Sequence, residues 1–80
     1  MTTKKIGPNA YEIQFADGLL ILFSYGEPVA ARSHAGAHGA AVKTDKYFSR
    51  TTSGHIKKWL DGAPCAVLPH VEMQRMAAAR

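Results

Sequence analysis

The pair Asp17-Gly18 constrains this chain more than any other local feature, because this dipeptide readily supplies the two positive φ values of a tight hairpin turn. The alternating segment YEIQF precedes it, and the apolar run LLILF follows it. We therefore predict a β-hairpin with a two-residue turn, in which Ala16 pairs with Leu19. In this register one face forms the core and carries Tyr11, Ile13, Phe15, Leu20 and Leu22.

The opposite face of the second predicted strand is also apolar, so something must cover it. In an antiparallel sheet with one solvated face, these positions would be polar. The residues on this face are Leu19, Ile21, Phe23 and Tyr25. Either another element of the chain covers them, or they form an apolar partner face, with a second copy of the chain as one candidate partner.

The middle and the end of the chain alternate between extended and helical patterns. Gly26-Glu27-Pro28 breaks the second strand, and VAARS predicts the next one. AVKTDKYFS predicts a further strand over residues 41–49, with its register left open. The Gly, Ala and His residues of 34–40 predict a flexible loop. CAVL predicts an edge strand, and HVEMQRMAAAR after Pro69 predicts a terminal helix.

A short helix is predicted over residues 53–61, with Gly62 at its end. A hydroxyl oxygen accepts readily from a free N–H of a first helical turn, so the cap is Thr51, Thr52 or Ser53. The apolar stripe of this helix holds Ile56, Trp59 and Leu60. We expect Trp59 to anchor the core.

The order of these elements, with strands first and helices after, predicts an α+β fold. Eighty residues form one domain, residues 1–80, and bury only about 60 to 65% of the surface that the unfolded chain exposes. We expect a small antiparallel sheet of three to five strands, packed against one or two short helices and covered on one side.

Positive charge is concentrated in the middle of the chain. The net charge is +4, and residues 32–58 hold six basic residues and one acid. An anionic partner could bind where the first N–H groups of the helix are free, and Tyr47 could stack on a single-stranded base. Alternatively, the hydroxyls only cap the helix and the lysines near its end only stabilise the dipole. The candidate residues for nucleic acid or another partner are Arg32, Lys43, Lys46, Tyr47, Arg50, Thr52, Ser53, Lys57 and Lys58.

The sequence lacks the residue patterns that support catalysis, cofactor binding or metal binding. There is no pair of carboxylates, no cysteine beside a placed histidine and no phosphate-binding loop, so we expect no catalytic residue. His34 and His38 have no partner ligand beside them, so we expect no metal. Cys65 is the single cysteine, and the longest apolar run is too short to span a bilayer, so we expect a cytoplasmic protein without membrane contact.

Three segments, SYGEPVAA, KTDKYFSRTTSGHIKKWLDG and VLPHVEMQRM, resemble a family of small, functionally uncharacterised proteins from bacteriophages and prophages. The resemblance spans about residues 11–69, and TTS.HI..WL is its most specific part. It implies a phage or mobile-element origin and a compact α+β fold, with no assigned activity. The chain departs from the family at Gly54, where relatives often carry a basic residue, and in the loop HAGAHGA.

Together these observations favour a non-enzymatic phage accessory protein of the host bacterial cytoplasm that acts by binding. Its basic face would contact nucleic acid or a ribonucleoprotein. One alternative is an inhibitor of a host defence complex, of the anti-CRISPR type, that binds protein. The other is a homodimeric interaction module.

Overall fold

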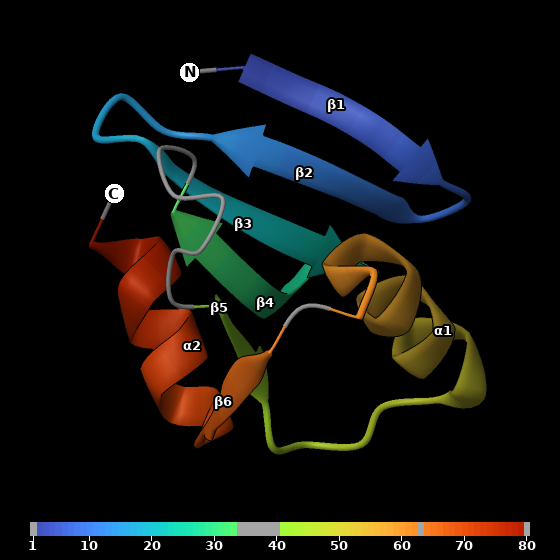
Figure 1. Ribbon diagram of the computed structural model, residues 1–80. Helices are drawn as coiled ribbons and strands as arrows, with labels where there is room; N and C mark the ends of the chain where they lie inside the picture. The colour runs from blue at the N-terminus through green and yellow to red at the C-terminus, as the bar shows by residue number, and fades with distance from the viewer. Residues whose placement is uncertain (1, 34–40, 63, 80) are drawn as a thin grey trace.

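The computed structural model describes residues 2–33, 41–62 and 64–79, and its strands lie in the sheet in their order along the chain (Figure 1). The elements are β1 (Thr2–Gly7), β2 (Ala10–Gln14), β3 (Leu19–Ser24), β4 (Glu27–Ser33), β5 (Ala41–Thr44), α1 (Arg50–Leu60), β6 (Cys65–Leu68) and α2 (His70–Ala78). The predicted α+β class is confirmed. Within the described residues, however, the sheet has six strands and not the three to five that we predicted. The predicted flexible loop, 34–40, lies outside the described residues.

The sheet is mixed, which corrects the prediction of an antiparallel one. Strands β1 to β5 pair antiparallel with their neighbours, whereas β6 pairs parallel with β5. A parallel neighbour requires a crossover connection, and α1 supplies it. β6 lies at the edge of the sheet, as predicted, and β1 forms the other edge. β1 was not predicted, because its polar residues show no apolar alternation.

The β2–β3 hairpin is closed by a loop of Ala16, Asp17 and Gly18. Phe15 N donates to Leu19 O at 2.8 Å, and Gly18 N donates to Phe15 O at 3.0 Å. Gly18 has a φ of 88°, the left-handed conformation that ends a three-residue hairpin loop. The predicted pairing of Ala16 with Leu19 is therefore wrong by one residue. A slip of one residue moves each side chain of β2 to the other face relative to β3.

The observed register divides the predicted core face between the two sides of the sheet. Ile13 lies opposite Ile21 and Tyr11 lies opposite Phe23, with the Tyr11 and Phe23 rings stacked at 5.5 Å between centroids. Leu20 is instead opposite Gln14 and points to the other side.

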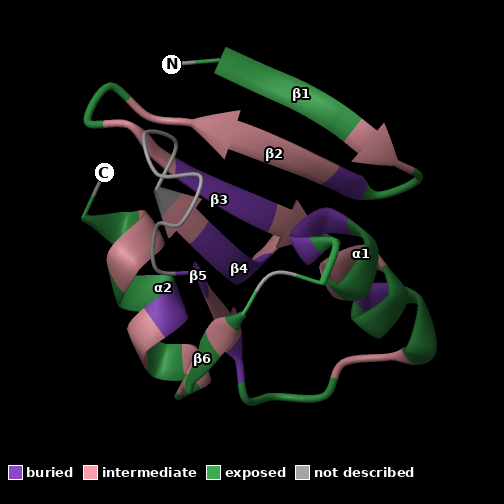
Figure 2. Cartoon of the chain, in the orientation of Figure 1, coloured by how far each residue is buried: buried purple, intermediate pink, exposed green. Residues whose placement is uncertain are grey.

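Each side of the sheet carries a hydrophobic cluster beneath a different helix, and Figure 2 shows the buried residues of β3 and β4 between the two helices. The cluster beneath α1 holds Leu20, Leu22, Val29, Ala30, Ala41, Trp59 and Leu60. The cluster beneath α2 holds Ile21, Ala31 and Met73, with Phe15, Leu19, Phe23, Val42, Leu68, Met76 and Ala77 packed against it. The expected single covered side is therefore wrong, and β3 is apolar at consecutive positions because both its faces are buried.

The predicted apolar partner face is not a continuous exposed surface. Ile21 is fully buried in the cluster with Met73 of α2, and Leu19 and Phe23 pack against this cluster. Tyr25 is not part of the strand, because it lies in the β3–β4 turn with a φ of 53° and is 57% exposed. The chain's own C-terminal helix thus covers most of this face.

α1 begins earlier than predicted, at Arg50. Its N-cap is Ser49, whose hydroxyl oxygen accepts from the Thr52 N–H at 3.1 Å. The predicted caps, residues 51–53, instead lie inside the first turn. The helix ends at Leu60, one residue before the predicted end, and the left-handed residues Asp61 and Gly62 follow it with φ values of 49° and 78°. β5 is in turn shorter than predicted, because residues 45–49 form the loop that leads to the cap.

Candidate functional site

Arg32, one of the predicted binding residues, has partners within the fold although its side chain is partly exposed. Its guanidinium lies 4.5 Å from the Trp59 ring centroid, and its Nη1 donates to Trp59 O at 3.4 Å. The Nη2 atom is 4.0 Å from Glu12 Oε1. The Trp59 indole is 6% exposed, and its Nε1 donates to the same Glu12 oxygen at 2.7 Å. Trp59 is therefore a core residue, as predicted, and Arg32 mainly holds α1 against the sheet.

Thr52 is also directed inward, so it does not contribute to an exposed surface. Its side chain is 2% exposed, and its hydroxyl lies 3.0 Å from Ser24 Oγ and accepts from Ser49 Oγ at 3.2 Å. Ser24 Oγ is in turn 3.0 Å from His55 Nδ1. This cluster of hydroxyls fastens the start of α1 to the end of β3.

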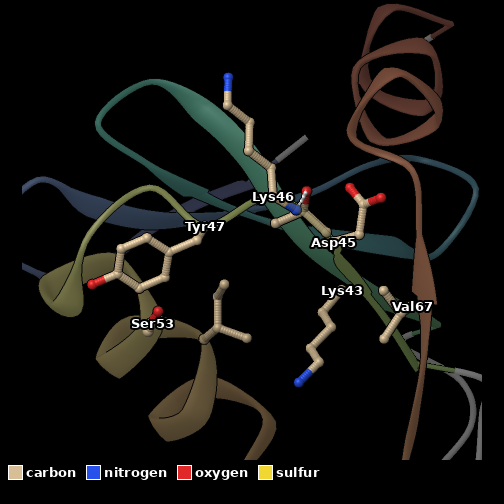
Figure 3. A pocket seen from close by; sticks show the side chains of 8 residues that line it. Lys43, Asp45, Lys46, Tyr47, Ser53 and Val67 are labelled. Carbon is tan, nitrogen blue, oxygen red and sulfur yellow. Dashed lines mark hydrogen bonds between the residues drawn. The ribbon is translucent and has the colours of Figure 1, made fainter.

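Four of the other predicted residues line a cavity of about 330 Å³, which we call the α1–β5 pocket (Figure 3). Its lining residues are Lys43, Thr44, Asp45, Lys46, Tyr47, Ser53, Ile56 and Val67. They come from β5, from the loop after it, from α1 and from β6. Because β5 and β6 are parallel, their carboxyl ends meet at one edge of the sheet, where ligand sites are common in folds with parallel strands. The structure thus brings together four predicted residues: Lys43, Lys46, Tyr47 and Ser53.

Figure 3 shows how these side chains are oriented around the pocket. Lys43 and Lys46 extend in opposite directions, so their ammonium groups do not converge on one point. Tyr47 lies beside Ser53 and is 72% exposed, while Val67 stands at the other end and is 54% exposed. The pocket therefore has cations on two sides, an exposed aromatic ring and an apolar lining that includes Ile56.

Asp45 is the one acid among the lining residues, and its carboxylate accepts a hydrogen bond from the start of α2. Its Oδ1 accepts from the His70 N–H at 3.1 Å, which satisfies a free donor at the start of that helix. The positive end of the α2 dipole offsets part of this negative charge. Asp45 therefore neutralises the neighbouring lysines less than its position in the sequence indicates.

The remaining predicted cations lie on the outer side of α1. Arg50, Lys57 and Lys58 are exposed. Lys57 and Lys58 occupy the last turn, where the helix dipole stabilises positive charge. This position agrees with the alternative in which these lysines only stabilise the dipole. Arg50 is different, because it lies in the first turn, which holds no acid and where the dipole disfavours a cation.

A second cavity of about 360 Å³, the turn pocket, was missed by the sequence analysis. It is lined by Ser24, Tyr25, Glu27, Phe48, Ser49, Thr51 and Thr52. Consecutive residues of the loop 45–49 line the two cavities, Tyr47 the α1–β5 pocket and Phe48 the turn pocket. The only signal in the sequence was Tyr25-Gly26, where a tyrosine takes the turn position that usually holds Asn, Asp or Gly.

Across residues 2–33, 41–62 and 64–79, no group of three or more His, Cys, Asp or Glu side chains is placed to hold a metal ion. His34 and His38, the pair considered for a metal in the sequence, lie outside those ranges. Neither helix in the described part of the chain has the length and the apolar character needed to cross a membrane.

The fold and these pockets define a small α+β domain with a helix on each side of a mixed sheet and a basic, partly aromatic rim at one edge. The chain belongs to DUF8033, a family of unknown function, whose model matches residues 1–74. No curated protein and no solved structure matches it.

Proposed function

We propose that this protein binds nucleic acid in single-stranded form at the α1–β5 pocket, without catalysis. One observation supports this function best: the ring of Tyr47 is 72% exposed on a loop between cationic side chains. An exposed aromatic ring offers a stacking surface to any unpaired base, whereas the bases of a duplex are stacked on each other. Lys43, Lys46 and Arg50 would contact the phosphates.

The divergence of the two lysines favours a strand over a single phosphate. An isolated phosphate is held best by cations that converge on it, and Lys43 and Lys46 point apart. A strand that runs over Tyr47 would instead meet the two lysines at successive phosphates. Arg50 adds a further exposed cation at the start of α1, where the dipole also favours an anion. The net charge of +4 attracts a polyanion from a distance.

The alternatives have less support from the surface. Homodimer formation relied on the apolar partner face that α2 largely covers. Inhibition of a host defence complex by protein binding relied on that face or on the basic face. A phage or prophage origin is a separate proposal. It is tested by the genes that adjoin the coding sequence, since neighbours with no relation to phages would count against it.

The proposal is tested by fluorescence anisotropy with labelled dT12 and rU12 strands at several salt concentrations. Three phosphate contacts on a single strand give a slope of about −2 for the logarithm of affinity against that of salt concentration. The double variant Lys43→Gln/Lys46→Gln should weaken binding and bring the slope to roughly −0.7. Double-stranded DNA should bind more weakly, because it offers no unpaired base to Tyr47.

The matched control is Lys4→Gln/Lys5→Gln, which removes the same charge from β1 at the opposite edge of the sheet. It should leave affinity and slope close to those of the wild type. Equal losses in the two double variants would mean that binding depends on net charge alone, and the proposed site would be rejected.

A further inference from the structure

The turn pocket has an inner wall of fixed polar groups. Ser24 and Thr52 line it and are each 2% exposed, and their hydroxyls lie 3.0 Å apart. Ser49 adds a third hydroxyl, which donates to Thr52. Because these groups bond each other, the wall keeps its shape without a ligand, as a preorganised site requires.

A carboxylate also lines the pocket, and a largely buried histidine with an unpaired nitrogen lies near this carboxylate. Glu27 lines it with a side chain that is 40% exposed. The His70 side chain is only 10% exposed, and its Nδ1 is 2.8 Å from Thr44 Oγ1. Its Nε2 is the one buried side-chain nitrogen or oxygen without a hydrogen-bond partner in the described part of the chain. That atom is 3.9 Å from Glu27 Oε1, too far for a hydrogen bond.

Two aromatic residues also line the pocket, Phe48 and Tyr25. Phe48 lines the pocket, with its ring 4.9 Å from the His70 ring and the Lys46 ammonium 4.9 Å from its centroid. Tyr25 stands at the rim with a φ of 53°, a conformation that is strained for a bulky residue. Strained residues of this kind concentrate at functional sites.

This lining selects the chemistry of the ligand. A carboxylate only accepts hydrogen bonds, so the group opposite Glu27 must donate. Among the nucleobases only guanine presents two adjacent donors, N1–H and the N2 amino group, which match the two oxygens of one carboxylate. The hydroxyls of Thr51 and Tyr25 line the same pocket and can donate to guanine O6. Thymine and uracil place one donor between two acceptors, which a carboxylate repels.

We propose that the turn pocket binds a guanine base of the strand, with Glu27 as the residue that gives base specificity. The inference rests on the proposed single-strand binding at the neighbouring pocket. Tyr47 and Phe48 are consecutive residues that line the two pockets, so successive nucleotides of one strand can occupy them. Lys46 lines one pocket and lies over an aromatic wall of the other, where it can contact the phosphate between the two bases.

The experiment compares a dT12 strand with strands that carry one central dG, deoxyinosine, dA or dC, all by fluorescence anisotropy. One bidentate contact discriminates between bases by roughly 5- to 150-fold, so the dG strand should bind tighter than dT12 by a factor in that range. Deoxyinosine lacks the N2 amino group and should lose most of this gain. Because inosine changes only the ligand, this comparison does not depend on the folding of any variant.

The protein variant is Glu27→Gln, with Glu72→Gln as its matched control. Both remove one negative charge, but Glu72 lies on α2 and pairs with Arg75 instead of lining the turn pocket. Glu27→Gln should abolish the preference for guanine and keep dT12 binding, whereas Glu72→Gln should keep both. Thermal unfolding of both variants confirms that they are folded.

The outcomes separate the two proposals. If the wild type binds dT12 with the predicted salt dependence but shows no preference for dG, the guanine pocket is rejected and single-strand binding stands. If dG is preferred and Glu27→Gln keeps that preference, Glu27 is not the residue that gives base specificity, and the inference is overturned. If no strand binds, both proposals are rejected.

Discussion

Replacing Glu12 by alanine should destabilise this protein strongly, although Glu12 lies on a strand near the edge of the sheet. The change leaves the Trp59 indole N–H, in a side chain only 6% exposed, without its acceptor at 2.7 Å. A hydrogen bond to a charged group contributes about 1.5 to 3 kcal/mol. The Arg32 pair, at 4.0 Å and partly exposed, adds at most about 1 kcal/mol. We therefore expect a loss of about 2 to 3 kcal/mol in the free energy of unfolding.

The magnitude is large relative to the total, because a chain of eighty residues is stable by about 4 to 12 kcal/mol. In a domain of this size, 1 kcal/mol shifts the melting temperature by about 4 to 8 °C, so the expected decrease is roughly 8 to 24 °C. Urea unfolding followed by tryptophan fluorescence measures the free energy, and thermal unfolding followed by circular dichroism measures the shift in Tm.

Two further variants isolate the hydrogen bond. Glu12→Gln keeps an oxygen acceptor and loses only the charge, so it should cost about 1 kcal/mol. Gln14→Ala, two residues along β2, controls for strand propensity and should cost less than about 0.5 kcal/mol. If Glu12→Ala costs no more than Gln14→Ala, or if Glu12→Gln is as damaging as Glu12→Ala, the anchoring role of this bond is refuted.

Three other variants test separate parts of the structure. Ser49→Ala removes the cap of α1 and should cost about 1 kcal/mol in urea unfolding, whereas an unchanged free energy would place the cap elsewhere. Met73→Ala empties a fully buried position and should cost about 2 to 5 kcal/mol; a loss below 1 kcal/mol would mean that α2 is not packed as described. Tyr47→Ala should weaken binding of dT12 by roughly 5- to 150-fold in anisotropy with Tm unchanged, and equal affinity would exclude stacking on this ring.

The hairpin was predictable from the sequence, but its register was not. Asp17-Gly18 correctly marks the connection between β2 and β3. A glycine with positive φ, however, fits both the second position of a two-residue turn and the last position of a three-residue loop. The apolar pattern normally decides between such registers, but β3 is apolar on both faces and therefore supplied no preference. The turn alone could not fix which side chains share a face.

The covered second face and the parallel strand depend on contacts between distant parts of the chain. The pattern of the terminal helix predicted only a weak apolar side, yet Met73 is fully buried against Ile21 and Ala31. The pairing of β6 with β5 depends on where α1 packs, since the crossover decides which strands become neighbours. Local secondary-structure propensity therefore predicts neither the covered second face nor the parallel pairing of β6 with β5.

The candidate site was predictable in part, because charge and exposure follow composition more closely than burial does. Lys43, Lys46, Tyr47 and Ser53 do meet at one pocket. Arg32 and Thr52 do not line this pocket, since their partners lie far away in the sequence: Trp59 and Glu12 for Arg32, and Ser24 for Thr52. The turn pocket could not be predicted for the same reason, because its lining residues come from distant parts of the chain, including the β3–β4 turn and the start of α1.

The most direct test of single-strand binding is an NMR titration of the isotope-labelled protein with unlabelled dT8, which reports on each backbone amide separately. We predict that the largest chemical-shift changes fall on residues 43–47 and on Ser53, Ile56 and Val67, around the α1–β5 pocket. The amides of β1, at the other edge of the sheet, should change little. Changes centred on β1, or none at saturating dT8, would contradict the proposed function.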